Sequence, residues 1–110
     1  MPFAIRSYRR VPICCPIAYQ TGDFEGHGTV WNCSMTGWRF SGTLPLREGE
    51  IFSLTAKLPS EQNVYVLAAS VCWVRGEDYG ADTLLMDEES REVLGRYLDQ
   101  DLIDWMESHW

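Results

Sequence analysis

The sequence contains few basic residues and few histidines. Of its 110 residues only 9 are Lys or Arg, against 16 Asp or Glu, which gives a formal net charge of −7. Proteins that bind DNA or RNA need a basic surface, so this composition argues against nucleic-acid binding. His27 and His109, the only histidines, lie in a glycine-rich segment and next to the last residue. We therefore expect no histidine-dependent catalytic triad, no metal or cofactor, and no enzymatic activity.

The sequence also lacks a long hydrophobic run. No stretch of about eighteen apolar residues occurs, so we expect no membrane span. The apolar segment after Arg10 contains Pro12 and Pro16 and does not lead to small residues, so we interpret it as a β-strand and not as a signal peptide. None of the four cysteines forms a Cys-x-x-Cys pair. We expect a cytoplasmic protein whose thiols are reduced and buried: Cys14, Cys15, Cys33 and Cys72.

The sequence does contain enough apolar residues, many of them in alternation, to form the core of one domain. The length and an apolar content of 45% fit a single domain over residues 1–110. Period-two alternation after Arg10 predicts a half-buried strand, and its prolines indicate an edge strand or the first strand. Residues 21–28 are rich in glycine and predict a turn. Further strands are expected at 29–34, 38–42, 51–59, 64–76 and 81–86, so residues 11–86 should form a β-barrel or sandwich.

The pattern changes from period two to helical spacing after Met86. Asp87 is a suitable N-cap, and the acids that follow it favour the first turn of a helix. Apolar residues then recur at helical spacing: Leu94, Leu98, Leu102, Trp105 and Met106. We expect an amphipathic helix over residues 87–107 whose apolar stripe packs on the sheet.

Charge is distributed unevenly along the chain. The N-terminal segment carries Arg6, Arg9 and Arg10, whereas the helix is strongly acidic. Such an arginine cluster is either a solvated terminus or an anion clamp, because guanidinium groups bind phosphate and the O6/N7 edge of guanine through paired hydrogen bonds. An anionic ligand could therefore bind the N-terminal half.

A second polar motif interrupts the apolar strands at residues 31–40, "WNCSMTGWRF". It is either a hairpin turn in which Gly37 supplies an unusual backbone angle, or part of a binding site. In the second case Asn32 and Ser34, two apart on a strand, would project from the same face towards a polar ligand. Gly37 would allow that ligand to approach closely.

Taken together, the two motifs resemble those of the PilZ domain family. Its Arg-x-x-x-Arg motif matches Arg6 and Arg10, and its Asp/Asn-x-Ser-x-x-Gly motif matches Asn32, Ser34 and Gly37. The resemblance extends through "LREGEIFSL" and "SVCWVRGEDYG" over nearly the whole chain. It implies a mainly β fold, a six-stranded antiparallel barrel with a C-terminal α-helix, and binding of the bacterial second messenger cyclic di-GMP.

The resemblance also suggests which residues bind the ligand. Arg6, Arg9 and Arg10 would meet phosphates and guanine edges, and Asn32 and Ser34 would bond the base or phosphate. Trp73 could stack on a guanine or could equally fill the core. Asn32 stands where aspartate is commoner, and Trp38 follows Gly37 where a smaller residue is frequent. The apolar Gly-Val-x-Phe pattern has become Gly-Ala-Asp-Thr at residues 80–83, which leaves that strand's register open.

Two functions are consistent with these features of the sequence. In the first, the chain is a stand-alone cyclic di-GMP receptor that signals to an unidentified protein partner. Its arginine-bearing segment, residues 1–10, would be mobile without ligand and fold across the barrel mouth with it. In the second, the fold is a ligand-independent interaction module that docks a partner through the acidic helix or the tail from Trp105 to Trp110.

Overall fold

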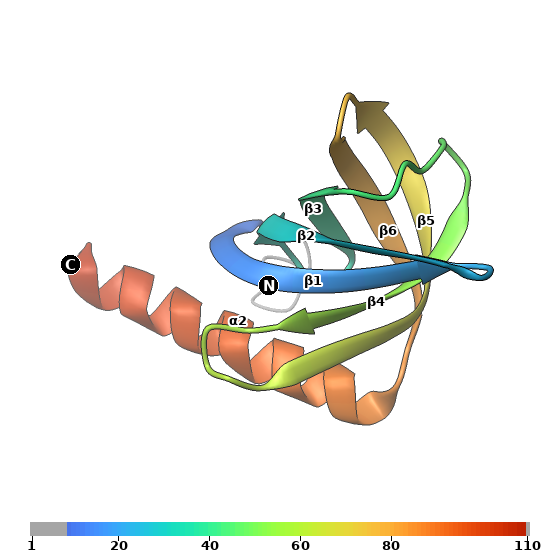
Figure 1. Cartoon of the computed structure of the whole chain (residues 1–110). Helices are drawn as coiled ribbons and strands as arrows, with labels where there is room; N and C mark the ends of the chain where they lie inside the picture. Colours follow the sequence, from blue (N-terminus) through green and yellow to red (C-terminus); the bar gives the residue numbers. More distant parts are fainter. Residues whose placement is uncertain (1–8, 110) are drawn as a thin grey trace.

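The computed structural model describes residues 9–109 and contains a closed antiparallel β-barrel with a helix against it (Figure 1). Within that part of the chain there are six strands in the spatial order β1-β2-β3-β6-β5-β4, with β4 pairing back to β1. Their bounds are β1 Val11–Thr21, β2 Phe24–Cys33, β3 Gly37–Gly42, β4 Ile51–Lys57, β5 Asn63–Arg75 and β6 Asp78–Met86. The predicted mainly β fold, a six-stranded barrel followed by a C-terminal helix, is confirmed.

Alternation along β1 builds one wall of the barrel. Its odd-numbered residues from Val11 to Tyr19 are buried, and Pro12 and Pro16 face outwards. β1 pairs with β4 only from Ile17 to Gln20. The prolines therefore lie in the half of β1 that has one neighbouring strand, where a missing N–H removes no hydrogen bond to β4.

The turn expected at residues 21–28 is much shorter than predicted. Thr21 pairs with Phe24, so the hairpin turn is only Gly22 and Asp23, and Gly22 has a φ of 58°. Gly26 and Gly28 belong to β2, where they pair with Tyr19 and Ile17 on β1. A Cβ on Gly28 would lie 1.7 Å from the Ser41 carbonyl oxygen on β3, and one on Gly26 would lie 2.5 Å from the Leu44 Cβ. Both positions thus require glycine for space, and the sequence alone does not distinguish this requirement from that of a turn.

Aromatic rings fill the barrel and hold one of its loops. Tyr19 and Phe40 pack edge to face with centroids 5.2 Å apart, and Phe52 and Tyr79 pack on the same cluster. The Tyr19 hydroxyl donates to the Leu44 carbonyl at 2.7 Å and accepts from the Leu44 N–H at 2.8 Å. The core thus fixes the loop between β3 and β4 as well as the strands.

Helix α2, Glu88–Ser108, begins as predicted. Asp87 is its N-cap and accepts a hydrogen bond from the Ser90 N–H at 2.9 Å. The Ser90 hydroxyl in turn accepts from the Tyr65 N–H on β5 at 2.8 Å. This pair of bonds ties the first turn of the helix to the barrel.

The second half of α2 does not pack as expected. Leu94 and Leu98 are buried, but Leu102 is only half-buried, and Trp105 and Met106 are exposed. In Figure 1 the C-terminal end of the helix extends past the barrel, consistent with overall dimensions of 46 × 28 × 26 Å. The stripe is continuous in sequence, but the barrel is shorter than the helix, so only the first half of the stripe has a surface to cover.

Two of the four cysteines also differ from the prediction. All four are free, but Cys14 and Cys72 are exposed, whereas Cys15 and Cys33 are buried. The alternation that buries Cys15 turns its neighbour Cys14 outwards.

No helix in the described range 9–109 is long and apolar enough to cross a membrane.

Candidate ligand-binding site

A row of paired residues crosses four strands on the outer face of the barrel. Asn32 on β2 pairs with Arg39 on β3, Arg39 pairs with Gly80 on β6, and Gly80 pairs with Trp73 on β5. Next to this row lies a pocket of about 200 Å³. It is lined by Arg10, Asn32, Trp38, Arg39, Cys72, Trp73, Gly80, Ala81 and Asp82. One residue of each sequence motif therefore lines the same pocket: Arg10, just before β1, and Asn32 on β2.

Arg10 joins the two motifs directly. Its Nη1 lies 3.5 Å from the Asn32 Oδ1, a long hydrogen bond. A Cβ on Gly37 would lie 3.2 Å from the Arg10 Nη2 and 3.1 Å from the Ala81 carbonyl oxygen. Gly37 thus leaves room for the guanidinium group over β3. It has no positive φ, so space and not an unusual backbone angle is what this position requires.

Ser34 has a structural role in the turn between β2 and β3. It lies one residue past the end of β2 and is buried. Its hydroxyl accepts from the Thr36 N–H at 3.2 Å, and its own N–H donates to the Gly37 carbonyl at 2.9 Å. The expected projection of Asn32 and Ser34 from one strand face is therefore not found, because the strand ends between them.

Trp73 lies on the barrel surface at the pocket and not in the core. It is half-buried, and a Cβ on Gly80 would lie 2.0 Å from its Nε1. The Arg75 guanidinium carbon lies 5.4 Å from the ring centroid, a cation–π distance. The tryptophan that does fill the core is Trp38, which is fully buried and donates from Nε1 to the Thr83 hydroxyl at 3.0 Å.

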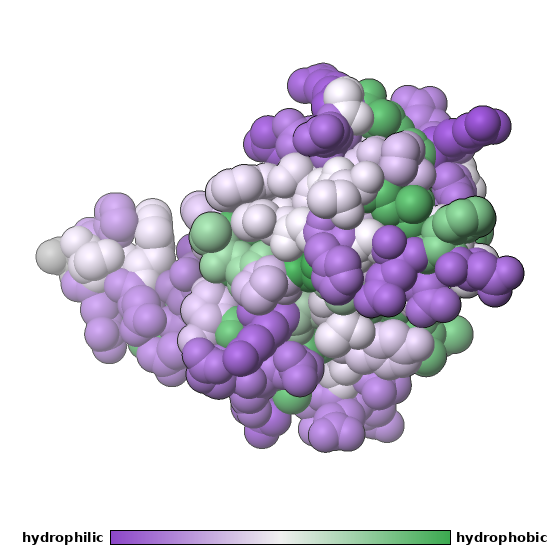
Figure 2. All heavy atoms as spheres, in the orientation of Figure 1, coloured by the Kyte–Doolittle hydropathy of each residue, from purple (hydrophilic) through white to green (hydrophobic). Residues whose placement is uncertain are grey.

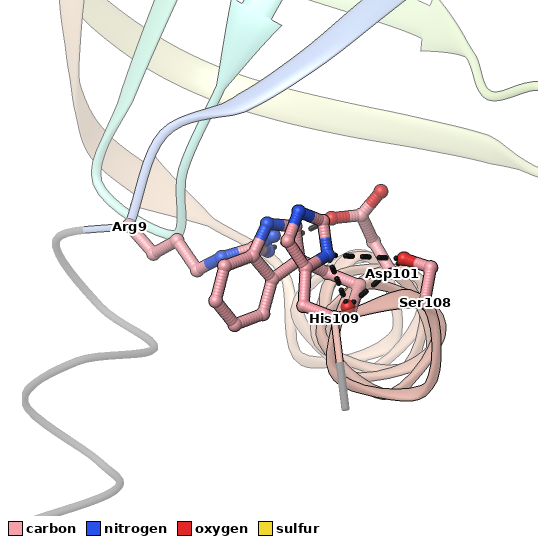
Figure 3. A network of polar contacts seen from close by, with 5 residues as sticks. Arg9, Asp101, Ser108 and His109 are labelled. Carbon is pink, nitrogen blue, oxygen red and sulfur yellow. Dashed lines mark hydrogen bonds and ion pairs between the residues drawn. The ribbon is translucent and has the colours of Figure 1, made fainter.

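Arg9 does not line the pocket; its side chain points towards the helix (Figure 3). Its Nη1 lies 2.8 Å from the Asp101 Oδ2, and the two side chains are 20% and 33% exposed. Near the helix end, Trp105 stacks on His109 with centroids 4.3 Å apart. Adjacent arginines thus serve different surfaces, Arg10 the pocket and Arg9 the helix. Arg6 lies outside the described residues.

Three lining residues with charged or thiol side chains were not predicted from the sequence: Arg39, Cys72 and Asp82. The alternation of "WRF", in which Trp38 and Phe40 are buried, could have placed Arg39 on the outer face. Nothing in the sequence indicates that β3 lies beside β6, the pairing that brings Asp82 opposite Gly37. That same pairing resolves the register of residues 80–83.

The pKa values of one thiol at the pocket and of two thiols in the barrel interior are raised. Burial and the neighbouring carboxylate of Asp82 raise the pKa of Cys72. Burial also raises the pKa of Cys33 to about 12 and that of Cys15 to about 11. No cluster of three or more His, Cys, Asp or Glu in residues 9–109 could hold a metal ion.

The side chains that line the pocket include two guanidinium groups, Arg10 and Arg39, the ring of Trp73, and the hydrogen-bonding groups of Asn32 and Asp82.

The structure is thus a small closed β-barrel with a surface pocket and one helix packed against it. The family model of the PilZ domain matches residues 4–100. The chain belongs to the PilZ domain family.

Solved structures share the fold at low sequence identity. The structure of the Bacillus subtilis inhibitor of motility (MotI/DgrA) superposes with a TM-score of 0.76 at 18% identity, covering 90% of this chain and 52% of that one. This chain thus spans about half the length of MotI/DgrA. The PilZ domain of CeSA from a cellulose-synthesizing bacterium superposes with a TM-score of 0.64 at 14% identity, covering 84% of this chain and 96% of that one. A search of curated protein sequences gave no match.

Proposed function

We propose that this chain binds cyclic di-GMP at the pocket between Arg10 and Trp73 and acts as an adaptor, not an enzyme, in the bacterial cytoplasm. The observation that carries the proposal is the position of Arg10. Its guanidinium group lies against both Asn32 and Gly37, so residues of both family motifs meet at one pocket. Cyclic di-GMP is a dianion with two guanines, and both parts are good partners for guanidinium groups.

The size of the pocket supports binding of part of the ligand. At about 200 Å³ it is smaller than the roughly 300–1,000 Å³ of sites that enclose a whole drug-sized ligand. One guanine would enter the pocket beside Trp73, where stacking on an aromatic ring contributes roughly 1–3 kcal/mol per base. The phosphates would remain outside, within reach of Arg10 and, in this proposal, of Arg6.

The remaining predicted residues would act indirectly. Ser34 would shape the turn that ends in Gly37, and Arg9 would connect the site to the helix. Arg9 is the residue directly before Arg10. A movement of Arg10 on binding would therefore change the position of Arg9 and its ion pair with Asp101. The proposed ordering of residues 1–10 would reach α2 through that pair.

The protruding half of α2 is the surface that we propose for the protein partner. Ile103, Trp105 and Met106 are 47%, 50% and 39% exposed. Acidic residues lie among them: Asp99, Asp101, Asp104 and Glu107. The matching partner surface would carry basic residues around an apolar groove, because such a surface complements both features.

Titration calorimetry with cyclic di-GMP tests the binding step. We expect wild type to bind and Arg10→Ala to lose about 10- to 100-fold in affinity, because hydrogen bonds to charged groups contribute roughly 1.5–3 kcal/mol. Arg47→Ala is a matched control that removes the same charge from the loop before β4, and it should bind like wild type. All three proteins should stay folded, since Arg10 is exposed and precedes the first strand.

The outcomes separate the two candidate functions. Equal affinities of wild type and Arg10→Ala would show that Arg10 is not part of the site. No binding by wild type would reject the receptor function and leave the ligand-independent module, in which the exposed half of α2 docks the partner without a nucleotide.

A further inference from the structure

Asp82 lies at the pocket although the proposed ligand is an anion. It is an exposed residue of β6, paired with Gly37 on β3 and with Ser70 on β5. It lines the same pocket as Arg10 and Arg39. A carboxylate at a phosphate-binding surface repels the ligand unless it binds another part of it. Its presence therefore needs a chemical reason.

The carboxylate of Asp82 forms no ion pair with a cation of residues 9–109. In that range the ion pairs of Arg9, Arg39 and Lys57 are made with other acids. The Cys72 thiol, which lines the same pocket, donates its single proton to the Ser70 carbonyl oxygen at 3.7 Å. The carboxylate oxygens of Asp82 therefore keep their capacity to accept hydrogen bonds from a ligand.

Asn32 cannot offer two acceptor oxygens side by side. Its single amide oxygen already accepts one hydrogen bond from Arg10, and the amide nitrogen is a donor. Arg10 and Arg39 are also donors only. Of the described side chains that line the pocket, Asp82 alone is a charged acceptor.

We propose that Asp82 reads the donor edge of a guanine in this pocket and makes the site selective for guanine. The N1–H and 2-amino groups of guanine form two parallel hydrogen bonds with a carboxylate, and O6 and N7 on the other edge accept from an arginine. Adenine has an acceptor at N1 and no 2-amino group, so it would leave the carboxylate unpaired, which is costly in a binding site. This inference rests on the proposed cyclic di-GMP binding and adds the residue that sets base specificity.

The test compares two ligands on wild type and Asp82→Asn. Cyclic di-inosine monophosphate lacks the 2-amino groups of cyclic di-GMP and is otherwise identical. We expect wild type to prefer cyclic di-GMP, and Asp82→Asn to lose about 10- to 100-fold of its cyclic di-GMP affinity, the range of one bidentate base contact. The ratio of the two affinities should approach one in the variant. Glu77→Gln, which removes one negative charge from the nearby β5–β6 turn, should behave like wild type.

Three results would overturn the inference. Tighter binding of cyclic di-GMP by Asp82→Asn would mean that the carboxylate only repels phosphate. Unchanged affinity would mean that it makes no contact. A retained preference for guanine over hypoxanthine would mean that another group reads the 2-amino edge. In each case wild type still binds, so these results differ from failure of the proposed function, in which wild type binds neither ligand.

Discussion

Arg9 and Arg10 are neighbours in sequence, yet their side chains contact different parts of the molecule. Arg10 reaches Asn32 over Gly37, and Arg9 reaches Asp101 on α2. The divergence arises at the point where the chain enters β1, since successive side chains of an extended chain point to opposite sides. Arg10 therefore lines the pocket, while Arg9 forms an ion pair with the helix.

Cys72 provides a residue-scale probe of the pocket. N-ethylmaleimide should modify Cys14 and Cys72 at about pH 8 and leave Cys15 and Cys33 unmodified, because the thiolate reacts and buried thiols are inaccessible. Cyclic di-GMP should slow modification of Cys72 several-fold in wild type, as followed by mass spectrometry of the peptides.

The matched control for this measurement is Arg10→Ala at the same ligand concentration. Its Cys72 should react at the rate of the ligand-free protein. If ligand protects Cys72 equally in both proteins, binding does not depend on Arg10. If calorimetry shows binding but Cys72 is not protected, the ligand binds elsewhere.

At the scale of elements, α2 has two halves with different surroundings. From Ser90 to Leu98 it packs on the barrel, chiefly on β5, and beyond Leu98 it is increasingly exposed. In the view of Figure 2 the protruding end is coloured mostly hydrophilic and intermediate. The pair of Arg9 with Asp101 is the ion pair that joins the described N-terminal residues to this second half.

Alanine substitutions along α2 should follow this division. Leu98→Ala should lower the free energy of unfolding by about 2–5 kcal/mol, because Leu98 is 2% exposed and its removal leaves a cavity. Leu102→Ala should cost clearly less, since its side chain is half-buried. Ile103→Ala, at an exposed position, should lie within about 0.5 kcal/mol of wild type.

Urea denaturation followed by circular dichroism measures all three. Equal losses at Leu98 and Leu102 would mean that the helix packs along its whole length. That result would also remove the exposed surface proposed for the partner.

At the scale of the whole molecule, two buried thiols make stability depend on pH. The barrel interior holds two thiols that burial keeps protonated, with the pKa of Cys15 at about 11 and that of Cys33 at about 12. In the unfolded chain both would titrate near the ordinary value of 9.0.

Stability should therefore fall in alkaline solution. Below pH 9 both states hold these protons, and the contribution of the thiols is fully present. As pH rises from about 9 towards about 11 and 12, the unfolded state loses protons that the folded state keeps, so the unfolded state is favoured. Urea midpoints of wild type measured from about pH 7 to about pH 10.5 should decline with a slope that Cys33→Val reduces, because valine cannot ionise. Equal slopes would show that the buried thiol of Cys33 does not contribute.

The sequence determined the strands and the helix more completely than how they pair and pack against one another. Alternation along Val11 to Tyr19 and the helical spacing after Asp87 depend on neighbours a few residues away, so the barrel strands and the start of α2 could be predicted. The arginine and Asn-x-Ser-x-x-Gly motifs indicated Arg10, Asn32 and Gly37 through their resemblance to the PilZ domain family, and guanidinium groups suit anion and guanine recognition.

Tertiary structure alone decided which side chains meet. Asp82 faces the pocket because β3 pairs with β6, and the chain between these strands is too long for local pattern to specify that pairing. Ser34 leaves the binding face because β2 ends at Cys33, a boundary set by the register with β1 and β3. Leu102 and Trp105 share a stripe with Leu98 but are half-buried and exposed, respectively. Hydrophobic spacing shows which side of a helix is apolar, and not how far the barrel extends along it.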